Sequence, residues 1–144
     1  MRSQKNRNLF RRLIYALCPL LFVFCFACCD KDDMIMNRWN LQYVRMNGKP
    51  LPDSSQFHLL PRYTYYVFLL EHSLNVETLA NGQYTESADG YYKFTSNSTI
   101  EMRFTILNQK THIKEAKIKK LNRKELHLEY KDRGDTYFMK LYAN

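Results

Sequence analysis

Hydrophobic and polar residues alternate with a period of two over most of the chain after residue 37. In a β-strand successive side chains point to opposite faces, so this alternation predicts strands with one buried face and one solvated face. The residues predicted to face inward are Trp39, Leu41 and Tyr43 in the first strand, Ile100, Met102, Phe104 and Ile106 in a central strand, and Leu126, Leu128 and Tyr130 near the end.

Other segments extend the same scheme. The apolar and aromatic run 63–70 predicts a strand that is buried on both faces or covered. Residues 111–121 fit a helical stripe through Ile113, Ala116 and Leu121 as well as a strand, and the strand is favoured because a turn at 122–124 leads into the next one. Further strands are expected at 72–79, 83–86, 91–95 and 136–142.

Dipeptides that end in glycine and clusters of polar residues separate these segments. Asn81-Gly82 and Asp89-Gly90 are dipeptides typical of two-residue hairpin turns. Residues 132–135 form another turn sequence. Eight or nine strands with short connections predict an all-β antiparallel meander. An eight-stranded up-and-down barrel removes exposed strand edges, and a two-sheet β-sandwich is the alternative.

The first 27 residues have a different character. Five basic residues precede an apolar run at 13–27, and small Ala27 precedes Cys28. This order indicates a cleaved secretory signal peptide. Because the run is shorter than the ~20 residues that span a bilayer, a retained membrane anchor is the weaker interpretation. A cysteine directly after the cleavage site is typical of a bacterial lipoprotein, so Cys28 is the predicted lipidation site, with Cys29 second.

These features predict three segments, with a signal peptide at 1–27, a lipidated cysteine and acidic tether at 28–36, and a folded domain at 37–144. The tether contains Lys31, Asp32 and Asp33, which resemble the export signal of Bacteroidetes lipoproteins. That resemblance implies display of the domain on the cell surface, anchored to the outer membrane by lipid.

Cleavage changes the charge balance. The whole chain has 22 basic and 14 acidic residues, and loss of the five early basic residues leaves 17 against 14, or +3 instead of +8. The basic pI therefore does not indicate nucleic-acid binding. No cysteine remains after residue 29, so a monomeric domain stabilised by its core without disulfides is expected.

Several motifs are similar to those of small lipocalin-like (calycin-type) lipoproteins of Bacteroidetes, a family of unknown function. Arg38-Trp39-Asn40-Leu41 with Met46-Asn47-Gly48-Lys49 resembles their first strand, in which Trp closes the barrel floor, although Arg38 occupies a position where Gly is usual. Gly82-Gln83-Tyr84, Tyr92-Lys93-Phe94, Ile100-Glu101-Met102 and the segment 118–128 resemble their later strands. The resemblance covers about 37–142 and implies an eight-stranded lipocalin-like barrel.

Two kinds of side chain are candidates for binding. Eleven Tyr and nine Phe are present, and aromatic side chains either fill a small barrel or line a ligand cavity. The candidate ligand-binding residues are Tyr65, Tyr84, Tyr92, Phe94 and Phe104. A basic cluster is a solvated hairpin or a surface for an anionic partner, and its residues are Lys114, Lys117, Lys119, Lys120, Arg123 and Lys124.

The sequence contains no nucleophile elbow, phosphate-binding loop or dinucleotide fingerprint, and its four histidines form no paired metal-ligand motif. His112 and His127 are placed to face each other across a hairpin, but no third ligand is indicated. We therefore expect no catalysis, cofactor or metal. The predicted function is binding of a small apolar or amphipathic ligand, and the alternative is a protein-interaction module in a surface complex, with residues 47–61 as the presenting loop or lid.

Overall fold

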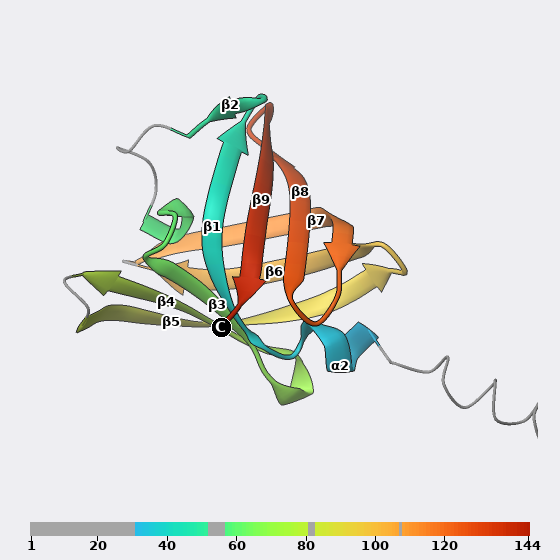
Figure 1. The fold of residues 1–144 in the computed structure, drawn as a ribbon, viewed down its shortest axis with the longest axis horizontal. Coiled ribbons are helices and arrows are strands. Elements are labelled where there is room, and N and C mark those ends of the chain that lie inside the picture. Colours follow the sequence, from blue (N-terminus) through green and yellow to red (C-terminus); the bar gives the residue numbers. More distant parts are fainter. Residues whose placement is uncertain (1–30, 52–56, 81–82, 107) are drawn as a thin grey trace, which may run out of the picture. The chain divides into compact units, whose positions relative to one another are not determined.

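The alternating segments form antiparallel strands in a computed structural model that describes residues 31–51, 57–80, 83–106 and 108–144 (Figure 1). The predicted signal peptide and Cys28 lie outside these residues. The strands are β1 Arg38–Met46, β2 Lys49–Pro50, β3 Thr64–Phe68, β4 Ser73–Ala80, β5 Gln83–Ser96, β6 Thr99–Ile106, β7 Gln109–Leu121, β8 Glu125–Asp132 and β9 Asp135–Ala143. The short helices are α2 Lys31–Ile35, η1 Phe57–Leu59 and η2 Leu70–His72.

The sheet closes on itself. Neighbouring strands follow the order β1, β3, β4, β5, β6, β7, β8, β9, and β9 pairs with β1 from Trp39–Ala143 to Met46–Tyr137. These eight strands make a closed antiparallel barrel, which confirms the predicted fold and excludes the two-sheet sandwich. The two-residue strand β2 folds back on β1 through Asn47-Gly48, whose φ angles of 52° and 80° are those that a tight hairpin turn needs.

The inward positions of β6 and β8 agree with the alternation. Ile100, Met102, Phe104 and Ile106 are buried, as are Leu126, Leu128 and Tyr130. Residues 109–121 form strand β7 and not a helix. The turn after β7 is held by the side-chain oxygen of Asn122, which accepts hydrogen bonds from the backbone N–H groups of Lys124 and Glu125 at 2.8 Å each.

The predicted turn at Asp89-Gly90 is wrong. Strand β5 runs without interruption through both residues, and Gly90 pairs with Phe104 of β6. A Cβ atom at Gly90 would lie 2.7 Å from the Phe104 Cβ and closer still to the Arg103 carbonyl oxygen. Glycine is therefore needed here for close approach of two strands, which local sequence does not distinguish from a turn glycine.

Strand β1 departs from strict alternation. The pairing of β1 with β9 shifts between Leu41 and Tyr43, which marks a β-bulge. The bulge reverses the faces beyond it, so Val44 is buried and Tyr43, predicted to face inward, is only half-buried. Before the bulge, Asn40 is buried together with its neighbours.

The run 63–70 is not buried on both faces. In β3 the buried residues are Thr64, Tyr66 and Phe68, and the residues between them are half-buried. Tyr63 and the two leucines at 69 and 70 are exposed. The outward positions of a barrel strand face solvent even when they are apolar, because only the inner face has a core to pack against.

One end of the barrel is closed by Trp39. Its indole is fully buried, and its Nε1 donates a hydrogen bond of 2.7 Å to the carbonyl oxygen of Ile35, which is also fully buried. The compact unit runs from Met34 to Asn144, so it begins three residues before the predicted boundary at 37. In residues 31–35, where a tether was expected, the chain is helical.

We call the end that holds Trp39 the closed end and the opposite end the mouth. Because consecutive strands are antiparallel, the connections alternate between the two ends. The segments 69–72, 97–98 and 122–124 lie at the closed end, whereas the turns 47–48 and 133–134 and the start of β7 lie at the mouth.

Candidate functional site

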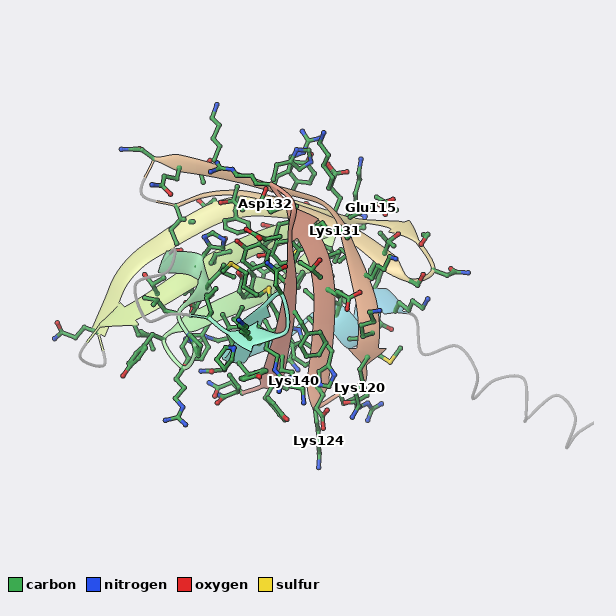
Figure 2. The ribbon with its side chains drawn as sticks, turned by 90° about the horizontal axis from the view of Figure 1, so that it is seen from above. Glu115, Lys120, Lys124, Lys131, Asp132 and Lys140 are labelled. Carbon is green, nitrogen blue, oxygen red and sulfur yellow. The ribbon has the colours of Figure 1, made fainter. Side chains whose placement is uncertain are left out.

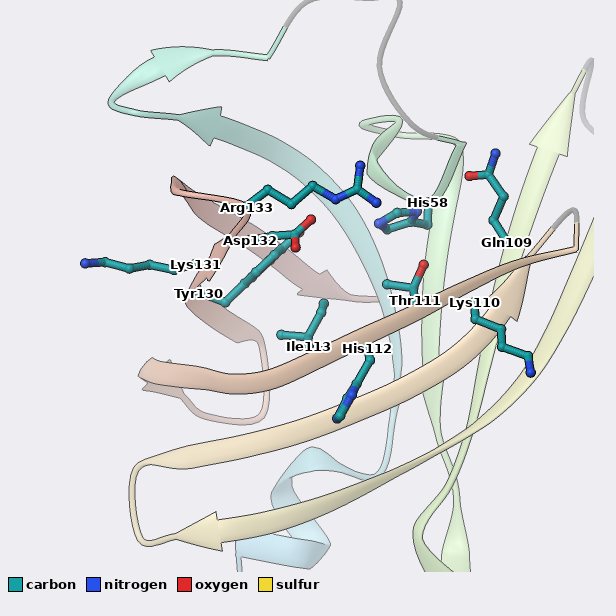
Figure 3. Close-up of a pocket in the computed structure, with 10 residues that line it drawn as sticks. All are labelled: His58, Gln109, Lys110, Thr111, His112, Ile113, Tyr130, Lys131, Asp132 and Arg133. Atoms are coloured by element: carbon teal, nitrogen blue, oxygen red, sulfur yellow. The ribbon is translucent and has the colours of Figure 1, made fainter.

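A cavity of about 570 Å³ opens at the mouth of the barrel (Figure 3). It is lined from three places far apart in sequence, namely η1, the start of β7, and the end of β8 with its following turn. Its lining residues are His58, Gln109, Lys110, Thr111, His112, Ile113, Tyr130, Lys131, Asp132 and Arg133. Pockets that bind small molecules commonly have volumes of about 300–1,000 Å³, so this one is large enough for a ligand.

The lining of the cavity is mainly polar, and it includes both buried residues and exposed charged ones. Ile113 and Tyr130 are buried, whereas Lys110, Lys131, Asp132 and Arg133 are exposed. In Figure 3 the side chain of Arg133 extends toward His58 across the opening. The side chains of Lys110 and Lys131 extend away from the opening (Figure 3), so the charged groups at the entrance are Arg133 and Asp132.

His58 is held neutral inside the mouth. Its side chain packs edge-on against Phe104 with 5.3 Å between ring centroids, and the residue is only 5% exposed. Burial lowers the pKa of His58 to about 4, and the nearby carboxylate of Asp132 opposes this shift without reversing it. At neutral pH the imidazole therefore offers one hydrogen-bond donor and one acceptor, and no charge.

The tyrosines beside the cavity are held protonated. Tyr130 stacks on Tyr137 with 5.1 Å between ring centroids, and burial raises the pKa of Tyr130 well above its usual value. The hydroxyl of Tyr66 donates a hydrogen bond of 2.8 Å to the His58 carbonyl oxygen, which fixes η1 against the barrel. The mouth thus combines neutral hydrogen-bonding groups with a charged rim, an arrangement suited to holding a polar or amphipathic molecule.

The predicted aromatic residues are not gathered in one site. Phe104 is buried below the mouth against His58, whereas Tyr92 donates a hydrogen bond of 3.1 Å to the Leu69 carbonyl oxygen at the closed end. Phe94 packs edge-on against Tyr92 at 6.3 Å and is half-buried. The side chain of Tyr84 lies outside the described residues.

Tyr65 lies on the outside of the barrel. The guanidinium of Arg38 sits 3.7 Å from its ring centroid and forms an ion pair of 3.0 Å with Glu77. Arg38, which occupies the position where the resembled family usually has Gly, therefore has a structural role on the outer wall. Among the ring contacts of the described residues, Phe104 is the one aromatic candidate that touches a residue lining the mouth cavity, namely His58.

The predicted basic cluster is divided along β7. Lys119 pairs with Glu129 at 2.9 Å and Lys120 pairs with Glu125 at 2.7 Å, so two of its cations have acidic partners on β8. Lys114 and Lys117 line a shallow outer groove together with Glu115 and Glu129. Arg123 and Lys124 are exposed in the turn at the closed end. The six cations are all exposed, and they differ in their surroundings along β7 and the turn that follows it.

A buried carboxylate on the outer wall escaped sequence interpretation. Glu101 is 6% exposed and forms ion pairs of 2.8 Å with Lys93 and Arg103 and a hydrogen bond of 2.8 Å with His112. The hydrogen bond from Lys93, followed by that from His112, lowers the pKa of Glu101 to about 2. The signal was present in the sequence only as alternating charges on strands whose register was unknown.

The histidines do not assemble into a metal site. His112 pairs with Arg103 across β6 and β7, whereas His127 pairs with Lys120, so the two do not face each other as the sequence allowed. Within residues 31–51, 57–80, 83–106 and 108–144, no group of three His, Cys, Asp or Glu side chains is placed to hold a metal ion. Among those same residues, no helix is long and apolar enough to cross a membrane.

The mouth residues themselves were missed as a site. Local sequence places His58 in an irregular loop and Asp132 and Arg133 in a turn. Nothing in the spacing of residues 58, 111 and 132 indicates that they meet. The length of the irregular stretch 47–61 was the one useful indication, because long loops often carry function.

Comparison with solved structures identifies the fold. A lipocalin-like protein from Bacteroides uniformis ATCC 8492 superposes with a TM-score of 0.50 and 16% sequence identity, covering 74% of this chain and 96% of that one. An uncharacterized protein from Bacteroides eggerthii DSM 20697 gives a TM-score of 0.45 and 18% identity over 74% of this chain and 98% of that one. No protein family and no curated protein matches the sequence. The fold is lipocalin-like, as the first-strand motif predicted.

Proposed function

We propose that this chain is a lipoprotein whose lipocalin-like barrel binds a small amphipathic molecule, without catalysis, in the cavity at its mouth. The observation that carries the proposal is that cavity, with a volume of about 570 Å³, the buried residues Ile113 and Tyr130 in its lining and Arg133 extending across its opening. An apolar tail would contact Ile113 and the ring of Tyr130. An anionic head would meet Arg133, and the neutral His58 would supply a hydrogen bond.

Titration calorimetry with laurate, a fatty-acid anion, tests the binding. Thr111 is half-buried in the lining, so Thr111→Trp fills part of the cavity without removing a core side chain. Thr105→Trp is the matched control, because Thr105 is exposed and lies directly across from Lys110 on the neighbouring strand. We expect Thr111→Trp to weaken laurate binding about tenfold or more and Thr105→Trp to leave it unchanged.

Laurate affinity that is equal in the two variants would place the ligand elsewhere. Failure of the unaltered protein to bind laurate would remove the amphipathic-anion proposal and favour the alternative function, a protein-interaction module in a cell-surface complex. The cavity supports the ligand-binding function over that alternative.

The proposed location is the outer membrane, with the barrel on the cell surface. It is supported by the signal-peptide pattern, by Cys28 as the acyl acceptor and by the acidic export motif at 31–33. Metabolic labelling with a fatty-acid probe should be lost in Cys28→Ala and retained in Cys29→Ala; the reverse result would assign the lipid to Cys29.

The export motif is tested separately. Replacing Lys31, Asp32 and Asp33 with alanine should preserve lipid labelling but reduce cleavage of the barrel by protease added to whole cells. Equal cleavage before and after the change would remove the motif's proposed role in display.

A further inference from the structure

The closed end of the barrel exposes apolar side chains. Among the described residues five large apolar or aromatic side chains are exposed. Three of them lie at this end, namely Leu69 and Leu70 after β3 and Tyr142 near the end of β9. Leu70 is 72% exposed, although it lies only two residues after the buried Phe68. A leucine this exposed contributes little to the core. Transfer of its side chain from water into another apolar environment would therefore be favourable.

The leucines share this end with the turn between β7 and β8. The backbone N–H of Phe68 donates to the Asn37 carbonyl oxygen at 3.0 Å, and that of Ala143 donates to the Lys124 carbonyl oxygen at 3.0 Å. These bonds tie the ends of β3, β1, β9 and β8 together in that order. Three strand spacings of about 4.8 Å separate the outer two, so Leu69 lies about 14 Å from the turn.

Basic side chains surround the same turn. Arg123 and Lys124 are exposed, and Lys120 and Lys140 both pair with His127 across the adjoining strands. Figure 2 shows Lys120, Lys124 and Lys140 together, on the opposite side of the view from Lys131 and Asp132 of the mouth. The acidic residues near this end are Glu71 and Glu125, and Asp32 and Asp33 directly precede Met34 in the chain. Glu125 pairs with Lys120. The five basic residues Lys31, Lys120, Arg123, Lys124 and Lys140 therefore exceed these four acids by one.

The chain also enters the barrel here. Met34 is the first residue of the compact unit, and Ile35 packs against Trp39 at the closed end. Five residues lie between Cys28 and Met34, so the six steps from one Cα to the other span at most about 20 Å when fully extended. If Cys28 is lipidated, a step that rests on the function proposed above, the covalent linkage holds the closed end within reach of the bilayer.

We infer that the closed end of the barrel docks on an anionic lipid surface. Leu69 and Leu70 insert into the interface, and the exposed ring of Tyr142 lies at the level of the headgroups, where tyrosine is favoured. Arg123 and Lys124 pair with lipid phosphates. The mouth cavity, at the other end of the barrel, is then directed away from the membrane and remains open to ligand.

Fluorescence quenching by brominated lipids tests the docking on the full lipidated chain in vesicles. Leu70→Trp reports the closed end, and Thr105→Trp, exposed on β6 near the mouth, is the matched control. The native Trp39 is fully buried and gives the same background in both. Flotation separates vesicle-bound protein from free protein before the measurement. Loss of the lipid anchor then appears as failure to float, whereas loss of docking appears as reduced quenching of protein that does float.

On vesicles that contain brominated phosphatidylglycerol, quenching should be at least about twofold stronger for Leu70→Trp than for Thr105→Trp. Adding Arg123→Glu and Lys124→Glu to Leu70→Trp should reduce that quenching, as should raised salt, because exposed charges are screened. Equal quenching of the two variants, or equal quenching of Leu70→Trp on purely zwitterionic vesicles, would overturn the inference. Absence of quenching in both variants would also overturn the inference, and it would favour a protein partner for the exposed leucines.

Discussion

Gly90 gives the sharpest test of the fold, because its two interpretations predict opposite orders of stability. In the barrel it lies in the middle of β5 opposite Phe104, outside the left-handed region of φ. A Cβ atom would lie 2.7 Å from the Phe104 Cβ and 2.9 Å from its Cα. Carbon atoms normally approach to about 3.5–4.0 Å, so the added atom would be nearly 1 Å too close.

The clash cannot be relieved by a rotamer change, because the nearest atoms are the backbone and Cβ of β6. The strands must separate locally, which weakens ladder hydrogen bonds worth about 1 kcal/mol each in addition to an overpacking cost of about 1–3 kcal/mol. Gly90→Ala should therefore lower the free energy of unfolding by about 3 kcal/mol. Gly90→Asn should lower it further, because the side chain is larger.

Gly134 is the matched control. Its φ is 94°, and nothing lies within 4 Å of a Cβ built on it. The cost of Gly134→Ala is then backbone strain alone, about 1–2 kcal/mol, and Gly134→Asn should cost less than Ala because Asn tolerates positive φ. The order of Ala and Asn is thus reversed between the two sites.

Urea unfolding measures these differences through the fluorescence of Trp39, the one tryptophan in the sequence. Unfolding transfers its indole from the core to water, so the emission reports the global transition. A loss below about 1 kcal/mol for Gly90→Ala, or Asn tolerated better than Ala at position 90, would refute the close approach of β5 and β6 and restore the turn.

The other predictions concern the closed end, the mouth and the outer wall. Trp39→Ala should cost about 3–5 kcal/mol in urea unfolding followed by circular dichroism, and a loss below about 1 kcal/mol would show that the indole is not buried. The pKa of His58 falls from 6.5 to about 4 on folding. The free energy of unfolding that the neutral imidazole contributes is therefore complete above pH 6.5 and is lost as the pH falls toward 4. At pH 5 this loss should reach about 2 kcal/mol in the unaltered protein and be absent in His58→Leu. An equal dependence of unfolding free energy on pH in the two proteins would contradict the prediction. A double-mutant cycle of Arg38→Ala and Glu77→Ala should give a coupling of about 0.5–1 kcal/mol, since both side chains are partly exposed, and zero coupling would show that the pair is only coincident.

The sequence by itself determined the strands whose pattern is local. In β6 and β8 the apolar residues recur at every second position, and the pleat sends them all to one face whatever the neighbouring strands do. The turns at Asn122 and at Arg133-Gly134 could be predicted equally well. Each depends only on residues within the turn, through a side-chain oxygen that accepts backbone hydrogen bonds or through a residue that adopts positive φ. The number of strands and the shortness of their connections favoured a closed barrel over a two-sheet sandwich, and the pairing of β1 with β9 decided between them.

Only the tertiary structure decided the features that depend on pairing between distant strands. The bulge after Leu41 moves Tyr43 outward, and the contact of Gly90 with β6 turns an expected hairpin into one long strand. The burial of Glu101 likewise depends on which cations the register places beside it. The mouth cavity arises in the same way, since η1 meets β7 and β8 only after the barrel closes. Alternation is a property of one strand and can be read along the chain, whereas register, bulges and cavities are properties of several strands together.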